Sequence, residues 1–166
     1  MCALKLKKGR QADLFSGIVG TMEHVNLGKQ HPTAYKGVIA LSKETDEAVA
    51  QAGLEPALGD LVKIRVSQLN GCAFCLRMHT RDAIAKGETT DRLAVVAAWW
   101  ESQYFSDQER AALALAEEVT RLSVPEHREW DNGSLSDEQV SAISWLAIAM
   151  NAWNRIAIRS HYPVAP

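Results

Sequence analysis

Helix start and stop signals recur along this chain, and they constrain its fold more than any other feature. Alanine and leucine are abundant, while proline and glycine fall at the edges of segments. No alternating run of β-branched residues is long enough to predict a strand. The sequence therefore predicts an all-α fold, a compact helical bundle of about six to seven helices.

The positions of these signals predict where each helix begins and ends. Proline stands at the first helical position after His31 and after Glu55. Ser106 and Ser136 each open a capping-box pattern, and Asn70-Gly71 is typical of a helix end. The expected helices cover residues 14–27, 31–53, 55–70, 72–86, 90–100, 106–122 and 136–160.

The length and charge of the chain favour one domain without nucleic-acid or membrane partners. A chain of 166 residues buries a core without metal or disulfide staples, and no repeat or linker divides residues 1–166. Residues 1–12 are expected to be a flexible tail. The longest apolar run, residues 93–100, is far shorter than the roughly 20 residues that span a bilayer. The formal charge of −2 gives no electrostatic basis for binding nucleic acid or an anionic membrane.

Cysteine usage indicates a reducing compartment. Three cysteines do not make an extracellular disulfide framework, and no apolar segment follows the basic residues near Met1 as it would in a secretory signal. We therefore expect a cytoplasmic location. In such a compartment a Cys-x-x-Cys pair is more often catalytic or metal-binding than structural.

One such pair forms the strongest chemical motif in the chain. Cys72 and Cys75 are followed four residues later by His79. If Cys72 opens a helix, the three side chains fall within about 60° of one another on one face. Upstream, Asp60 lies on a preceding helix whose face leads toward the pair, and Gly71 marks a tight joint between the two helices.

This arrangement is suited to redox chemistry. A helix N-terminus favours the thiolate, most strongly for Cys72, and the spacing lets the sulfurs meet. A thiolate oxidised by a peroxide becomes a sulfenic acid, which the second thiol converts to a disulfide. His79 is suited to accept a thiol proton, and Asp60 to orient or recharge His79. A metal half-site and two inert buried cysteines are the alternatives, although no second ligand pair completes a closed zinc site.

Polar and aromatic residues outside this motif are better explained by packing. We expect four tryptophans in the core or at a subunit interface, and Asn151 and Asn154 at a helix junction or interface. The tryptophans are Trp99, Trp100, Trp145 and Trp153.

The stretch from Asp60 to His79 resembles the signature of the AhpD-like alkylhydroperoxidases, within the carboxymuconolactone decarboxylase family. That signature has an acid twelve residues before the first cysteine, then Ser-Gln, Cys-x-x-Cys and a histidine. In this chain Ser67-Gln68 stands between Asp60 and the cysteines. The likeness extends over roughly residues 20–160. Two departures are Asp60, where glutamate is usual, and Phe74, where some peroxidases have a second histidine.

The resemblance implies a helical subunit that forms a homo-oligomer, commonly a trimer or hexamer, and reduces hydroperoxides without a metal or prosthetic group. It assigns Cys75 as the peroxidatic thiol and Cys72 as the resolving one, although the helix dipole favours Cys72 as the thiolate. Cys72 is then expected to be exposed to an external dithiol reductant, a lipoylated or thioredoxin-like protein. His79 and Asp60 would manage protons.

Two other functions remain open at this point. A decarboxylase-type acid–base enzyme would use His79 and Asp60 and leave the thiols idle, but that branch typically lacks the cysteine pair. A helical assembly or binding module would use Cys72 and Cys75 for packing or as metal ligands.

Overall fold

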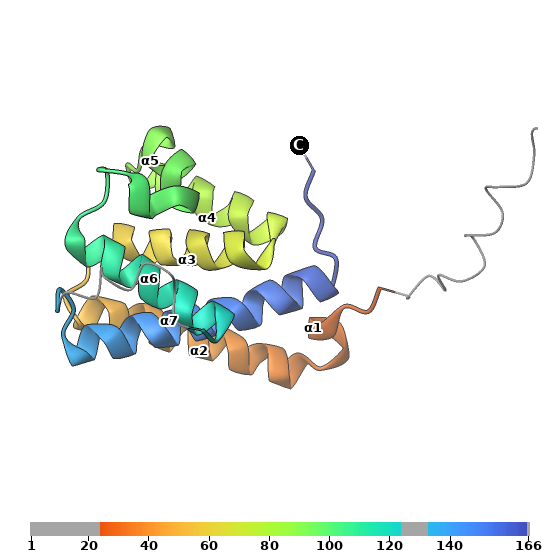
Figure 1. Cartoon of the computed structure of the whole chain (residues 1–166). Helices are drawn as coiled ribbons and strands as arrows, with labels where there is room; N and C mark the ends of the chain where they lie inside the picture. Colours follow the sequence, from red (N-terminus) through yellow and green to blue (C-terminus); the bar gives the residue numbers. More distant parts are fainter. Residues whose placement is uncertain (1–23, 124–132, 166) are drawn as a thin grey trace, which may run out of the picture.

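A computed structural model describes residues 24–123 and 133–165, and within them every regular element is a helix (Figure 1). The elements are α1 (Leu27–Gln30), α2 (Pro32–Gln51), α3 (Pro56–Asn70), α4 (Ala73–Ala85), α5 (Thr90–Val95), the 3₁₀ helix η1 (Val96–Glu101), α6 (Asp107–Arg121) and α7 (Asp137–Arg159). The all-α prediction is confirmed.

Local capping signals fix most of the helix boundaries. Pro32 and Pro56 occupy the first turns of α2 and α3. Ser106 and Ser136 form complete capping boxes, in which each hydroxyl accepts from the backbone N–H three residues later. These helices therefore begin where the sequence predicts.

The segment 90–100 was expected to be one α-helix, but the structure divides it in two. Thr89, rather than Thr90, caps α5, and from Val96 the chain continues as the 3₁₀ helix that contains the tryptophans. Ala98 leaves helical geometry altogether, with φ −126° and ψ 36°. This change of winding lets the fully buried Trp99 reach into the core.

The first predicted helix and the predicted tail fall largely outside the described residues. Within the described part, residues 24–26 are not helical, and the Asn26 side chain caps α1 by accepting from the Lys29 N–H at 3.0 Å. A short helix thus begins at Leu27, where the sequence predicted that one would end.

Helix α3 lies at the centre of the bundle, between α4 on one side and α6 and α7 on the other (Figure 1). Leu61 and Ile64 pack into one apolar cluster with Trp99, whereas Val62 and Val66 pack into a second cluster. Because α3 is buried on both faces, the cysteine turn at its end is attached to the most enclosed element of the fold.

A buried carboxylate ties α6 to this central helix. Glu117 Oε1 accepts from Arg65 Nε at 2.9 Å, from Arg65 Nη2 at 2.7 Å and from Trp99 Nε1 at 2.8 Å. Its second oxygen accepts from Arg121 Nη1 at 2.7 Å. Hydrogen bonds to each charge offset the cost of removing the ions from water.

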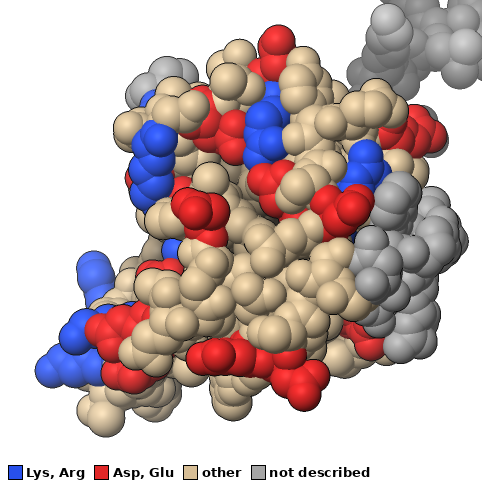
Figure 2. All heavy atoms as spheres, turned by 90° about the vertical axis from the view of Figure 1, so that its left-hand side faces the viewer, with Lys and Arg blue, Asp and Glu red and all other residues tan. Residues whose placement is uncertain are grey.

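The surface is mixed in charge and carries several apolar side chains. Figure 2 shows acidic and basic residues interspersed with uncharged ones on one face of the molecule. Trp145 is 51% exposed and is therefore not a core residue, unlike Trp99. Among the described residues, no helix has the combination of length and apolar character needed to cross a bilayer.

Candidate active site

The joint between α3 and α4 sets the position of the cysteine pair. Gly71 adopts the left-handed conformation, with φ 67° and ψ 31°. The Gly71 N–H donates to Gln68 O at 3.2 Å, and the Cys72 N–H donates to Ser67 O at 3.0 Å. Such a helix end favours glycine, because a Cβ is strained at this φ. The expected tight joint at Gly71 is confirmed.

Cys72 and Cys75 form a disulfide at the start of α4. The sequence predicts this position for the pair, at the N-terminus of a helix. Cys72 is the N-cap of the helix, and its Sγ accepts from the Cys75 N–H at 3.4 Å. The two Cα atoms are 5.4 Å apart. This separation lies within the range that disulfides require.

Both cysteines are buried within the subunit. Cys72 is 1% exposed and Cys75 is 2% exposed. The expectation that Cys72 is exposed to an incoming reductant is therefore wrong, because Cys72 packs into the core cluster that includes Ala157 of α7.

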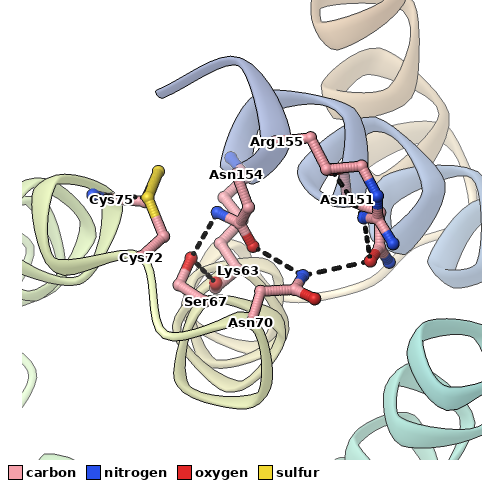
Figure 3. Close-up of a disulfide and its surroundings, with 8 residues drawn as sticks. All are labelled: Lys63, Ser67, Asn70, Cys72, Cys75, Asn151, Asn154 and Arg155. Carbon is pink, nitrogen blue, oxygen red and sulfur yellow. Dashed lines mark hydrogen bonds between the residues drawn. A yellow bond between two sulfur atoms is a disulfide. The ribbon is translucent and has the colours of Figure 1, made fainter. Parts of the chain in front are cut away.

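A network of side-chain amides joins α3 to α7 next to the cysteine turn (Figure 3). Asn154 Nδ2 donates to Ser67 Oγ at 3.1 Å, and Asn70 Nδ2 donates to Asn154 Oδ1 at 2.9 Å and to Asn151 Oδ1 at 3.0 Å. Asn154 is fully buried, and Ser67 also supplies the carbonyl that accepts from Cys72. The expected helix-junction role of Asn151 and Asn154 is confirmed, and the structure adds that this junction supports the cysteine turn.

A cavity of about 400 Å³ opens beside Cys75 and His79. Its walls come mainly from α2, α4 and α7 and are largely apolar, with Trp153 and Met150 among them. Lys63 also lines the cavity, where its Nζ lies 2.7 Å from Asp46 Oδ1. Cys75 and His79 thus face the same enclosed space, whereas Cys72 does not line it.

His79 is neutral near pH 7 in the disulfide form. Burial lowers the pKa of His79 from 6.5 to about 4, because desolvation disfavours the imidazolium, and the Lys63 ammonium lowers it further. Asp82, whose Oδ2 lies 3.9 Å from His79 Nδ1, acts in the opposite direction more weakly. A neutral imidazole is in the correct state to accept a proton.

Asp60 has a partner that the sequence did not predict. The carboxylate is buried, and its oxygens accept from Lys86 Nζ at 3.0 and 2.7 Å. Lys86 extends from the end of α4, one residue beyond Ala85. The negative charge of Asp60 raises the pKa of His79, but less than burial lowers it. Asp60 therefore acts on His79 through its charge while its hydrogen bonds go to Lys86.

The titration of His79 predicts acid sensitivity of the disulfide form. Between pH 6.5 and 4 the unfolded chain binds a proton at His79 and the folded chain does not, so acid favours unfolding. We expect a loss of about 3 kcal/mol in the free energy of unfolding from pH 7 to pH 4. Urea titrations at both pH values should show a smaller loss in His79→Leu.

His161→Asn, at an exposed histidine, is the matched control and should lose as much stability as the wild type. An equal loss in His79→Leu and in the wild type would contradict the prediction.

The described residues provide no cluster of three or more His, Cys, Asp or Glu side chains that would hold a metal ion. The chemically active groups that the structure brings together are the two cysteine sulfurs and the His79 imidazole, with Asp60 and Lys63 acting on that imidazole through charge.

Comparisons with known proteins found one family model and related sequences. The family model described as the carboxymuconolactone decarboxylase family matches residues 32–118. The uncharacterized protein YdfG of Bacillus subtilis (strain 168) is 38% identical over 121 residues, 69% of this chain and 81% of the relative. The uncharacterized protein YnjA of Escherichia coli (strain K12) is 38% identical over 64 residues, 39% of this chain and 35% of the relative.

A crystal structure from Agrobacterium tumefaciens has a similar fold. It matches with a TM-score of 0.72 and 35% sequence identity, over 86% of this chain and 99% of the other. Its description is a protein of unknown function and a candidate antioxidant defence protein, AhpD.

Proposed function

This chain belongs to the carboxymuconolactone decarboxylase family, and we propose that it is a thiol-dependent peroxidase that reduces alkyl or other hydroperoxides. The observation that carries the proposal is the Cys72–Cys75 disulfide, because Cys75 lines a largely apolar cavity together with a neutral histidine. The likeness to a candidate antioxidant defence protein supports the same reaction class.

The oxidative half of the cycle begins at Cys75. His79 accepts the Cys75 proton, and the thiolate attacks one peroxide oxygen. The O–O bond breaks, an alcohol leaves after taking up a proton, and Cys75 becomes a sulfenic acid. Cys72 then attacks the Cys75 sulfur, which releases water and closes the disulfide. Cys75 takes the first role because it lines the cavity together with His79.

His79 changes its proton affinity during this cycle. In the disulfide form its pKa is about 4, but a Cys75 thiolate one helical turn away adds a negative charge that favours the imidazolium. The histidine is therefore a stronger base when the thiolate forms than when the disulfide is closed. The protonated histidine then supplies the proton that the leaving alcohol requires.

Asp60 supports His79 through its charge in this proposal. We expect Asp60→Asn to slow peroxide reduction about tenfold. Loss of a group that itself transfers the proton would slow the reaction about a hundredfold or more. Lys86→Gln breaks the same ion pair but retains the Asp60 carboxylate and a side-chain donor at position 86, so it should slow the reaction less than Asp60→Asn. Equal slowing in the two variants, measured by peroxide consumption, would mean that the ion pair itself matters.

The reductant in this cycle is an external dithiol carried by a lipoylated or thioredoxin-like protein. We propose that the cycle runs in the cytoplasm. Two electrons from that dithiol reopen the disulfide, so the cysteine sulfurs supply the redox chemistry without a metal or prosthetic group.

We also propose that the subunit forms a homo-oligomer, a trimer or hexamer. Trp145 and Ile148 lie on one face of α7 and are 51% and 42% exposed, and Ile39 of α2 is 48% exposed. Exposed apolar side chains of this size favour burial against another subunit. Light scattering after gel filtration should give a multiple of 18.3 kDa, which Trp145→Glu should lower. A monomeric wild-type protein would contradict this.

The decisive test of the proposed function is thiol stoichiometry. Reduced protein mixed with cumene hydroperoxide should lose two thiols per subunit and regain them with excess dihydrolipoamide. A Cys72→Ser/Cys75→Ser double variant should neither consume peroxide nor lose thiols. Unchanged thiols in the wild type would overturn the proposal, and retained turnover of a lactone acid by the double variant would favour acid–base chemistry instead.

A further inference from the structure

The two cysteines of the disulfide line different hollows. Cys75 lines the cavity of about 400 Å³ that also contains His79. Cys72 lines a second hollow of about 220 Å³, formed by the Gly71–Ala73 turn and the residues around the end of α7. Neither hollow is lined by both cysteines, so a molecule in either hollow contacts one cysteine of the pair.

An aromatic pair separates the two hollows. Phe74, Ala157 and Tyr162 line both of them. The Phe74 and Tyr162 rings meet edge to face, with centroids 5.0 Å apart, and the Tyr162 hydroxyl lies 3.3 Å from that of Tyr35. Residues that line two hollows form the wall between them, and the Tyr162–Tyr35 hydroxyl contact holds this wall on the side of the larger cavity.

Tyr162 and Val164, in the segment 162–165 that follows α7, line the second hollow. Figure 1 shows this segment leaving the end of α7 and rising past the α3–α4 joint. Arg77 of α4 holds it in place, since its Nη1 donates to Ala165 O at 2.5 Å and its Nη2 to Pro163 O at 3.4 Å. Val164 lines the hollow and is itself 45% exposed. Cys72 is thus covered by a short segment that two hydrogen bonds from one side chain hold in place.

We propose that the dithiol reductant reaches Cys72 through this second hollow, and that residues 162–165, held by Arg77, limit its entry. The inference rests on the proposed peroxidase function and adds to it a separate route for each half of the cycle. Hydroperoxide enters beside Cys75, and the reductant enters beside Cys72.

The chemistry of the reductive half is thiol–disulfide exchange at Cys72. A thiolate of the reductant attacks Cys72 Sγ, the Cys72–Cys75 bond breaks, and Cys75 leaves as a thiolate. The second thiol of the reductant then attacks the mixed disulfide and releases Cys72. The reductant leaves as its own disulfide, and its two protons end on Cys72 and Cys75.

Two variants that loosen the segment in different ways test the inference. Arg77→Gln removes the hydrogen bonds, and deletion of residues 163–166 removes the cover but keeps the Arg77 charge. Both should speed reduction of the disulfide by dihydrolipoamide at least about fivefold, since fivefold corresponds to losing one ordinary hydrogen bond and Arg77 makes two. The rate at which cumene hydroperoxide oxidises the reduced variants should stay within about twofold of wild type, because that step uses the other hollow.

Arg81→Gln, at an exposed arginine one turn further along α4, is the matched control and should leave both rates unchanged. Unchanged reduction in both variants, or equal acceleration of both half-reactions, would overturn the inference while leaving the peroxidase function in place. If dihydrolipoamide does not reduce the wild-type protein, or hydroperoxide does not oxidise it, both this inference and the proposed peroxidase function are overturned.

Discussion

Replacing Cys75 with serine is expected to lower kcat/KM for cumene hydroperoxide by about a thousandfold or more, because a serine hydroxyl remains protonated and is not oxidised by peroxide. Cys75 is the sulfur that lines the cavity with His79, so no other described thiol occupies its position. A coupled assay with excess dihydrolipoamide measures the loss, and mass spectrometry should find no intramolecular disulfide in the variant.

The matching change at Cys72 should stop the cycle at a different point. Cys72→Ser retains the thiol that faces the cavity, so one equivalent of peroxide should still be consumed. The resulting sulfenic acid should persist and be trapped by dimedone, since no neighbouring thiol condenses with it. Turnover supported by dihydrolipoamide should be lost.

Cys2→Ser controls for the loss of a cysteine as such, because Cys2 is not part of the Cys-x-x-Cys pair. It should behave like the wild type in both assays. If Cys75→Ser consumes peroxide and Cys72→Ser does not, the roles of the two sulfurs are reversed.

The largest expected effect on stability comes from Glu117→Leu, at about 3–5 kcal/mol in the free energy of unfolding. The substitution leaves the Arg65 guanidinium without its buried carboxylate and removes the acceptor of the Trp99 indole N–H. Arg65 is 5% exposed, so water does not replace the missing partner. Urea unfolding followed by circular dichroism measures the change.

Glu118→Leu, at the next residue of α6, is the matched control and should change the free energy of unfolding by less than about 1 kcal/mol. Glu117→Gln removes the negative charge of the side chain but nearly keeps its shape. It should still show a large part of the loss seen in Glu117→Leu, because the Arg65 guanidinium stays buried without an opposite charge. A loss no greater than that of Glu118→Leu would mean that the buried network contributes little.

Most of the helices were predictable from local sequence because their ends are fixed by local chemistry. A serine with Glu or Gln three residues later satisfies its own helix N-terminus, and a glycine at positive φ ends a helix without help from distant residues. The segment after Thr89 was less predictable. Its winding changes where Trp99 enters the core and donates to Glu117, eighteen residues away.

In the candidate site, too, local features were predictable and contacts between distant residues were not. Cys72, Cys75 and His79 lie within eight residues on one helix, so their spacing alone predicts a shared face. The partner of Asp60 is Lys86, which is 26 residues away, and the amide that supports Ser67 comes from Asn154, 87 residues away. No periodicity in the sequence encodes these contacts.

Local sequence was enough to predict the helical class, most helix boundaries, the tight joint at Gly71 and the order of the reactive groups along α4. Each depends on backbone geometry within a few residues. Tertiary structure alone decided that both cysteines are buried, that they face separate hollows, and that burial holds the pKa of His79 near 4. Burial and desolvation depend on which distant helices pack over a residue, and α7 with the segment after it supplies much of that cover.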